Sequence, residues 1–174
     1  MDAGGNDTRT TELHPFPMDT AAVPGPGAGQ TSLESRSAPQ PHLTSVAVAS
    51  VTSDEKPYGV RMDSSGHALR GDEPVSRGGG DTGPAPFGLL LAGLGACTSI
   101  TLRMYAEHKQ WPLAGADVEL SYIVVDRSTR WIDRKITLRG ALDDDQRATL
   151  ARIAEKTPVT MAVRAGTEIR TAVR

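Results

Sequence analysis

The chain has 174 residues, which is a usual length for a single domain. Its 19 Lys and Arg nearly balance its 21 Asp and Glu, for a net charge of −2. Binding to nucleic acids or acidic membrane surfaces depends on clustered basic residues, so we expect neither as a partner. One cysteine excludes an intramolecular disulfide, and four scattered histidines lack the spacing of metal ligands, so we expect no metal and no cofactor.

The first part of the chain differs in composition from the rest. Residues 1–42 are rich in Gly, Pro, Ser, Thr and Ala, with few apolar side chains to offset the entropy lost on ordering. We predict a disordered tail over 1–42, in which a partner-binding motif is the alternative, and a folded domain over 43–174. No basic segment followed by an apolar one opens the chain, and its longest apolar run, residues 89–94, is short for a membrane span. The expected location is the cytoplasm.

The domain is predicted to begin with three antiparallel strands. Residues 45–52 form a β-prone run, and residues 58–62 alternate apolar with polar side chains. The turn-forming residues 63–66 follow, and residues 67–70 are the predicted return strand.

A glycine-rich loop over residues 77–86 comes next, and it raises the question of phosphate binding. The P-loop pattern fails because no Gly-Lys-Ser/Thr closes it. The dinucleotide pattern requires parallel strands around it, whereas the flanking segments are predicted hairpins. We therefore expect no nucleotide site here.

Pro86 favours the first turn of a helix, because its missing N–H would be unpaired there in any case. The predicted helix runs from Pro86 to near Gln110. Its first two thirds are apolar or small on every side, which is typical of a helix buried all round. The glycines and alanines at 92–96 disfavour helix, so we expect another backbone to pack closely against them.

Two strands are predicted after this helix. Residues 117–124 alternate with period two, residues 127–130 are a turn, and residues 131–139 return.

A second helix is expected to begin at a capping box formed by Asp143 and Gln146, and to stop at Pro158. The last run, residues 168–173, alternates apolar with polar side chains and is predicted to be a closing strand. The predicted order is β-β-β-α-β-β-α-β, an α+β domain with a mainly antiparallel sheet and a long buried central helix.

Residues 83–98 read Gly-Pro-Ala-Pro-Phe-Gly-Leu-Leu-Leu-Ala-Gly-Leu-Gly-Ala-Cys-Thr. This segment resembles the sequence around the reactive cysteine of the OsmC/Ohr superfamily, which usually reads Gly-Pro-x-Pro-aromatic-Glu-Leu-Leu-Leu-Ala-Ala-Leu-Gly-Ala-Cys-Thr. With the predicted order of elements, the resemblance covers about residues 44–174. It implies an intertwined homodimer, in which two central helices pack together, sheets wrap around them and active sites form between subunits.

The chemistry that this resemblance implies is reduction of small organic hydroperoxides by the thiolate of Cys97. The cysteine becomes a sulfenic acid, and an external thiol then reduces it. A nearby positive charge favours the reactive thiolate. Arg77, in the glycine-rich loop, stands at a spacing from Pro86 that suits this role, and Arg61 and Arg70 are alternatives.

The chain departs from the family pattern at two places. The family's second cysteine lies in a Cys-Pro-Val-His-like segment, which here reads Thr-Pro-Val-Thr from Thr157, and threonine cannot form a disulfide. The acidic residue expected near the start of the central helix falls at Phe87 or Gly88, and neither carries charge. Two interpretations stay open: a one-cysteine peroxidase with a degenerate active site, or a non-catalytic dimer that binds a small apolar ligand.

Overall fold

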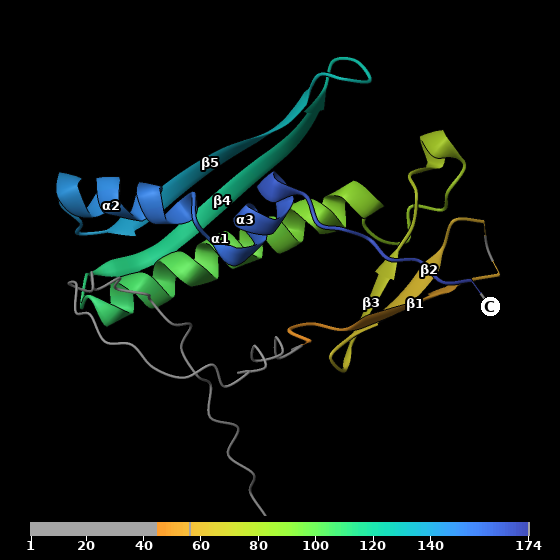
Figure 1. Cartoon of the computed structure of the whole chain (residues 1–174), viewed down its shortest axis with the longest axis horizontal. Coiled ribbons are helices and arrows are strands. Elements are labelled where there is room, and N and C mark those ends of the chain that lie inside the picture. Colours follow the sequence, from red (N-terminus) through yellow and green to blue (C-terminus); the bar gives the residue numbers. More distant parts are fainter. Residues whose placement is uncertain (1–44, 56, 174) are drawn as a thin grey trace, which may run out of the picture. The chain divides into compact units, whose positions relative to one another are not determined.

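The computed structural model describes residues 45–55 and 57–173, so the predicted tail over 1–42 lies outside the described residues. The fold is mixed α+β, with antiparallel sheets and one long helix (Figure 1). Its elements, in chain order, are β1 (Ala49–Ser53), β2 (Val60–Ser64), β3 (His67–Gly71), the short 3-10 helix η1 (Val75–Arg77), α1 (Pro86–His108), β4 (Leu113–Val124), β5 (Arg130–Gly140), α2 (Asp144–Ala154) and α3 (Pro158–Ala165).

The predicted three-stranded start is confirmed. Strands β1, β2 and β3 form one antiparallel sheet in that order. Ser65 and Gly66 make the β2–β3 turn with positive φ angles of 53° and 86°, and the Asp63 carboxylate accepts a hydrogen bond from the Gly66 N–H at 3.1 Å. Every residue of β1 is exposed, and so is Leu69 on β3. This sheet therefore has apolar side chains that the described part of the chain leaves uncovered.

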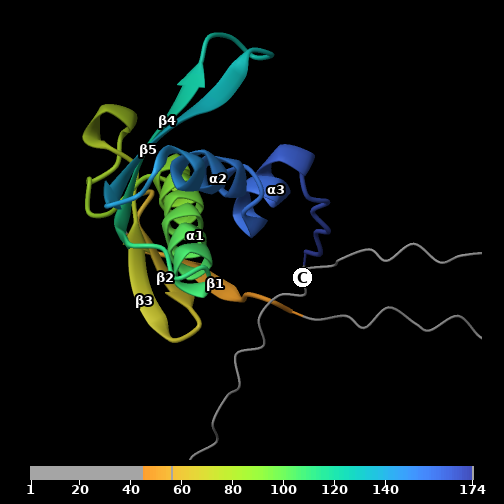
Figure 2. The same cartoon turned by 90° about the vertical axis from the view of Figure 1, so that its left-hand side faces the viewer.

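Strands β4 and β5 form a long antiparallel hairpin, as their alternating sequences predicted, and both are longer than expected. The turn between them is held by Asp126, whose carboxylate accepts hydrogen bonds from the N–H groups of Ser128 and Thr129 and from the Ser128 hydroxyl. These bonds lower the pKa of Asp126 to about 2, and the bond from the Ser128 hydroxyl has the largest effect. Helix α1 packs along β4, and α2 and α3 also contact α1 (Figures 1 and 2).

The core lies where α1 meets α2 and the hairpin. Its buried residues are Leu102, Ala106, Leu142, Leu150 and Ala154. The buried residues of α1 recur every four positions, so they line one stripe of the helix: Leu94, Thr98, Leu102 and Ala106.

The prediction that α1 is buried all round is wrong for the single chain. Ile100 is 59% exposed and Met104 is 58% exposed. Strand β4 and helices α2 and α3 cover one side of α1, and no other described element covers the opposite side.

By length and composition, α1 is also apolar enough to cross a membrane, and it is the one helix in the described part of the chain that is. The core helix of a soluble protein often has the same composition, so this finding is weak evidence for a membrane. The sequence prediction weighed only the uninterrupted run 89–94 and so underestimated the apolar length of this helix.

The predicted capping box is present. The Asp143 carboxylate accepts from the Gln146 N–H at 2.7 Å, and the Gln146 side chain accepts from the Asp143 N–H at 3.2 Å. Helix α2 ends at Ala154, however, and Pro158 begins a further helix, α3, that was not predicted. Proline suits this first position because no N–H is needed there.

The closing strand predicted over 168–173 is a second correction. The described residues 166–173 belong to no strand, and Ile169 and Val173 are 87% and 93% exposed. An alternating pattern shows that a segment can present two different faces, but it does not provide the neighbouring strand with which a strand must pair. The last elements of the described residues are therefore the helices α2 and α3, in place of the predicted helix and strand.

Candidate functional site

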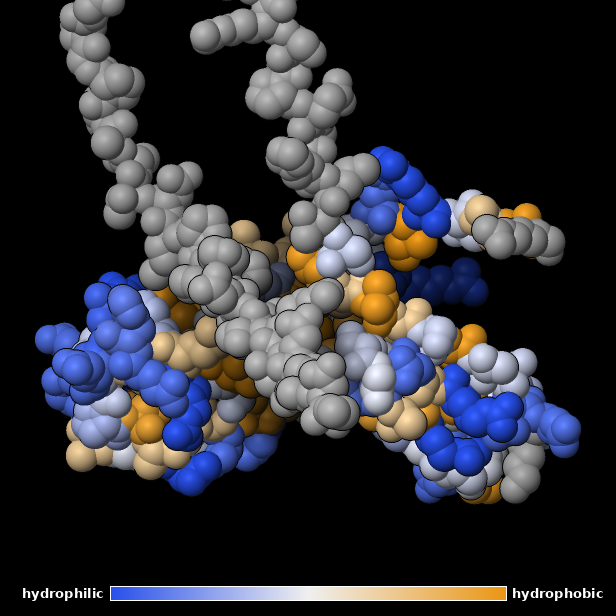
Figure 3. Space-filling view, turned by 90° about the horizontal axis from the view of Figure 1, so that it is seen from below, coloured by the Kyte–Doolittle hydropathy of each residue, from blue (hydrophilic) through white to orange (hydrophobic). Residues whose placement is uncertain are grey.

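Cys97 is partly exposed on α1. It lies beside the buried stripe of the helix, on a face that it shares with apolar or small residues spaced three and four apart. This set, Leu90, Gly93, Cys97, Ile100 and Met104, is called the α1 stripe below. Its large members are 40–59% exposed, and a Cβ added at Gly93 would meet no atom within 4 Å. Hydrophobic surface is visible in the space-filling view from below (Figure 3).

Arg77 lies in η1, and its Nη1 is 3.6 Å from Oε2 of Glu73. It lines a cleft at the start of α1 together with Phe87. Cys97 stands ten residues beyond Phe87, about 15 Å along the helix axis at 1.5 Å per residue. The described chain therefore places Arg77 and Cys97 in separate regions.

The two alternative arginines lie in the first sheet. Arg61 on β2 is directly opposite Arg70 on β3. The Arg70 guanidinium forms an ion pair with Asp54 at 3.0 Å.

The glycine-rich loop is organised around Asp72, which is 5% exposed. The Asp72 carboxylate accepts hydrogen bonds from the N–H groups of Gly80 and Thr82 at 3.1 Å and from the Thr82 hydroxyl at 2.8 Å. The bonds from Thr82 lower the pKa of Asp72, and the bond from its hydroxyl has the largest effect. A Cβ at Gly79 would collide with the Glu73 carbonyl oxygen, which explains that glycine. These loop N–H groups are directed at the protein's own carboxylate.

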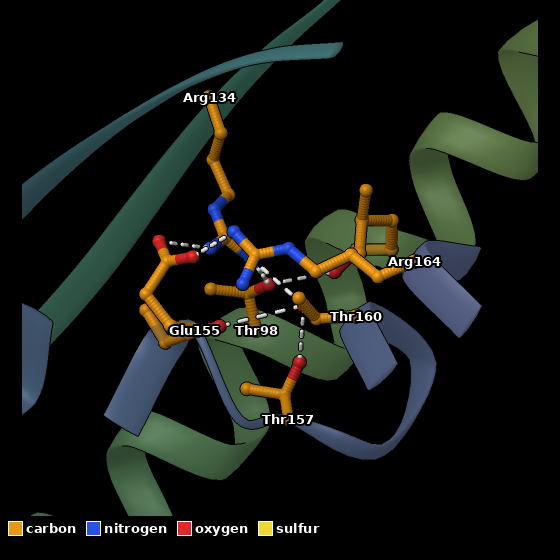
Figure 4. A network of polar contacts seen from close by, with 8 residues as sticks. Thr98, Arg134, Glu155, Thr157, Thr160 and Arg164 are labelled. Carbon is orange, nitrogen blue, oxygen red and sulfur yellow. Dashed lines mark hydrogen bonds and ion pairs between the residues drawn. The ribbon is translucent and has the colours of Figure 1, made fainter. Parts of the chain in front are cut away.

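Thr157, at the position of the family's second cysteine, is fully buried. Its hydroxyl is 2.7 Å from the hydroxyl of Thr160, which also lies 3.4 Å from the Ala154 carbonyl oxygen (Figure 4). The Arg134 guanidinium donates to the Thr160 hydroxyl at 2.9 Å and to the Thr98 hydroxyl at 3.2 Å. Hydrogen bonds thus connect position 157 to the residue next to Cys97.

Arg134, on β5, also pairs with Glu155, at 2.8 Å. Arg164 of α3 pairs with the other oxygen of the same carboxylate (Figure 4). Burial raises the pKa of Glu155, but the bonds from the two arginines outweigh it and leave this pKa below its usual value. Only 11% of the Arg134 side chain is exposed, whereas 61% of the Arg164 side chain is. A hollow of about 260 Å³ adjoins this network.

The sequence analysis singled out Thr157 but missed its partners. Arg134 and Thr98 are 36 residues apart, and Arg134 and Glu155 are 21 apart, so no local pattern connects them. The one available sequence signal was that Arg134 has an apolar residue two positions before it and another two positions after it, so it shares one face of β5 with them.

A family model described as OsmC-like protein matches residues 78–172. The chain belongs to the OsmC-like protein family. No curated protein sequence matches the chain.

Solved structures with the same fold include an OsmC-like protein from Mycoplasma pneumoniae, at a TM-score of 0.62 and 14% identity over 71% of this chain and 91% of that one. An organic hydroperoxide resistance protein OsmC from Legionella pneumophila aligns at a TM-score of 0.52 and 18% identity, over 70% and 91% of the two chains. An organic hydroperoxide resistance protein from Elizabethkingia anophelis aligns at 0.55 and 16% identity, over 73% and 94%. These likenesses establish the fold.

Replacing Arg134 by Met is expected to lower the free energy of unfolding by about 2–3 kcal/mol, because buried hydrogen bonds to charged groups contribute about this much. Methionine keeps most of the apolar stem, so the loss reports on the guanidinium. Urea denaturation followed by circular dichroism measures it.

Arg164→Met is the matched control, since it removes the exposed arginine from the same carboxylate. It is expected to cost less than about 1 kcal/mol, as exposed ion pairs do. Equal losses for the two variants would contradict a structural role specific to Arg134.

Proposed function

We propose that this OsmC-like protein reduces small organic hydroperoxides through Cys97, with an external thiol as reductant, in the cytoplasm and as part of defence against oxidative stress. The observation that carries the proposal is the match of residues 83–98 to the family's reactive-cysteine sequence, at a cysteine that the fold leaves partly exposed. The names of two related structures, both organic hydroperoxide resistance proteins, support the substrate class.

The proposed reaction has three balanced steps. The Cys97 thiolate attacks the outer peroxide oxygen, the O–O bond breaks, and the alkoxide takes a proton and leaves as an alcohol. The sulfenic acid condenses with one external thiol to give a mixed disulfide and water. A second external thiol then releases the Cys97 thiol and departs as an external disulfide. Because Thr157 has no sulfur, both reducing equivalents must come from outside the chain.

Two arginines are candidates for favouring the thiolate. Arg77 is kept from the sequence analysis, although its cleft is distant from Cys97 of the same chain. Arg134 is added because it donates to Thr98, the residue after Cys97. The rate of Cys97 oxidation in Arg77→Gln and Arg134→Gln separates them, since only loss of the arginine that favours the thiolate slows that step.

The proposal includes a homodimer, and the uncovered apolar surfaces of the single chain support it. The α1 stripe has no covering element in the described residues, and an apolar helix face of this size is normally buried. The first sheet exposes Val51 and Leu69, and three strands without a covered face are marginally stable. A second copy that packs on these faces and pairs with residues 168–173 would cover all of them.

One observation favours the alternative of a non-catalytic dimer that binds a small apolar ligand. Thr157 occupies the second-cysteine position with its hydroxyl fully buried and hydrogen-bonded, so this position serves packing here. A fold retained without redox chemistry would show this arrangement.

The decisive experiment is stopped-flow oxidation of the reduced protein by tert-butyl hydroperoxide, with mass spectrometry of Cys97. We expect rapid, stoichiometric conversion to sulfenic acid, followed by turnover when a dithiol is added. Cys97→Ser should lose all thiol-dependent peroxide consumption, because it is the one cysteine of the chain.

Oxidation of wild-type Cys97 no faster than that of a free thiol in solution would reject the peroxidase and favour the non-catalytic dimer. Peroxide consumption by Cys97→Ser at the wild-type rate would reject the role of Cys97.

Thr157→Cys tests whether position 157 keeps the geometry of the family's second cysteine. The variant is expected to form a disulfide with Cys97 on peroxide treatment, because the Thr157–Thr160–Arg134–Thr98 chain of hydrogen bonds brings these segments together. Disulfide formation requires Cα atoms within about 7 Å. Intact mass under denaturing, non-reducing conditions reads the bond, and Thr157→Ser is the control that retains the hydroxyl. Sulfenic acid without a disulfide would show that the two positions are too far apart.

Ile100→Glu, at the most exposed large residue of the α1 stripe, tests the homodimer. Two unpaired carboxylates in the interface are expected to raise the dissociation constant about 100-fold or more. Light scattering after size exclusion gives the mass of wild type and variant. Ala151→Glu, at an exposed position of α2, should leave the dimer unchanged. A monomeric wild type at micromolar concentration would remove the dimer from the proposal.

A further inference from the structure

Tyr58, in the turn between β1 and β2, has a backbone conformation that bulky residues rarely adopt. Its φ angle is 67°, in the left-handed region where a turn usually has Gly or Asn. The Asp54 N–H closes this turn by donating to the Gly59 carbonyl oxygen at 2.7 Å. Tyr58 is nevertheless 61% exposed, so burial in the core does not account for its strained conformation. Its role depends on what its ring contacts.

The ring of Tyr58 lies against Gly78, which directly follows Arg77 at the end of η1. A Cβ added at Gly78 would lie 3.2 Å from ring atom Cε2 of Tyr58, closer than most such contacts. Gly78 also has a positive φ angle, of 88°. Glycine is therefore required at this position both for the backbone conformation and for the close approach of the ring.

The interactions at the tip of the η1 loop are local. The N–H groups of Arg77 and Gly78 donate to the carbonyl oxygens of Pro74 and Val75 at 2.8 and 3.0 Å. The ion pair of Arg77 with Glu73, at 3.6 Å, also stays within the loop. These interactions determine the shape of the loop, but they do not connect its tip to the rest of the domain.

Two contacts provide that connection. At the base of the loop, the buried Asp72 carboxylate accepts hydrogen bonds from Gly80 and Thr82. At its tip, the ring of Tyr58 packs on Gly78. The direction in which the Arg77 side chain leaves the loop therefore depends on both contacts.

We propose that Tyr58 is a positioning residue, whose ring holds the η1 loop so that the Arg77 guanidinium favours the thiolate of Cys97. This inference rests on the proposed function, with Arg77 as the arginine that acts in an active site formed between subunits. Tyr58 acts through Arg77 and requires no contact with the thiol or the peroxide. Because a ring carbon makes the contact, the phenol hydroxyl is not needed.

Two substitutions separate the ring from the backbone conformation. Tyr58→Asn removes the ring but suits the left-handed region, which Asn adopts more readily than most residues. Tyr58→Phe keeps the ring and loses the hydroxyl alone.

Hydrogen exchange followed by mass spectrometry tests the hold on the loop without any peroxide. In Tyr58→Asn, the amides of residues 77–81 are expected to exchange about tenfold faster or more, because local opening breaks their hydrogen bonds. Tyr58→Phe should exchange at the wild-type rate. The amides of α2 are the internal control, since unchanged exchange there establishes that each variant is folded.

Stopped-flow oxidation by tert-butyl hydroperoxide tests the consequence for Cys97. Tyr58→Asn is expected to slow this step about 10- to 100-fold, as small misplacements of a catalytic group do, whereas Tyr58→Phe retains the wild-type rate. Tyr58→Asn/Arg77→Gln should be no slower than Arg77→Gln, because both changes remove the same contribution. A residue with a purely structural role would add its own loss to that of Arg77.

The inference is overturned if Tyr58→Asn leaves the exchange of the loop unchanged, or if it loosens the loop while Cys97 oxidises at the wild-type rate. Additive losses in the double variant would also overturn it. Oxidation of the wild type no faster than that of a free thiol is a different failure. It would reject the proposed function, and the role of Tyr58 in the reaction with it, whatever the exchange of the loop.

Discussion

The packing of α1 against β4, α2 and α3 positions the candidate site. Leu94, Thr98, Leu102 and Ala106 form the buried stripe, and Thr98 and Leu102 are completely inaccessible. Successive residues of a helix point about 100° apart. With Thr98 held inside by the Leu94 carbonyl and by Arg134, its neighbour Cys97 lies at the border between the buried stripe and the uncovered side, where it is partly exposed. The burial of one residue therefore determines the exposure of the next.

Much of the fold follows from short-range patterns. Period-two alternation predicted the β4–β5 hairpin, and the Asp143–Gln146 capping box predicted the start of α2, because both depend on neighbours within a few residues. The reactive-cysteine sequence likewise predicted the family. Pro158 was misjudged because proline ends one helix and begins another equally well; the preceding Thr157, which is the N-cap of α3, was the available sign of a helix start.

The parts that could not be predicted depend on residues far apart in the chain. The Arg134 network joins β5, α1 and α3, and only the fold brings these segments together. The cleft at the start of α1 is of the same kind, since Arg77, Phe87 and Arg130 belong to three elements. The closing strand failed for a related reason: Ile169 and Val173 have the right alternation, but no described strand pairs with this segment, and alternation alone does not tell which sheet edge a segment reaches.

The two departures from the family pattern have opposite physical consequences at two places in the fold, the N-cap of α3 and the first turn of α1. At position 157, threonine replaces a redox-active sulfur by a hydroxyl whose hydrogen bonds are all internal, so any oxidised Cys97 depends on a thiol from solution. At Phe87 and Gly88, the missing carboxylate leaves the N-terminal cleft with more positive charge than negative. The first change removes a chemical partner, and the second creates an attraction for anions.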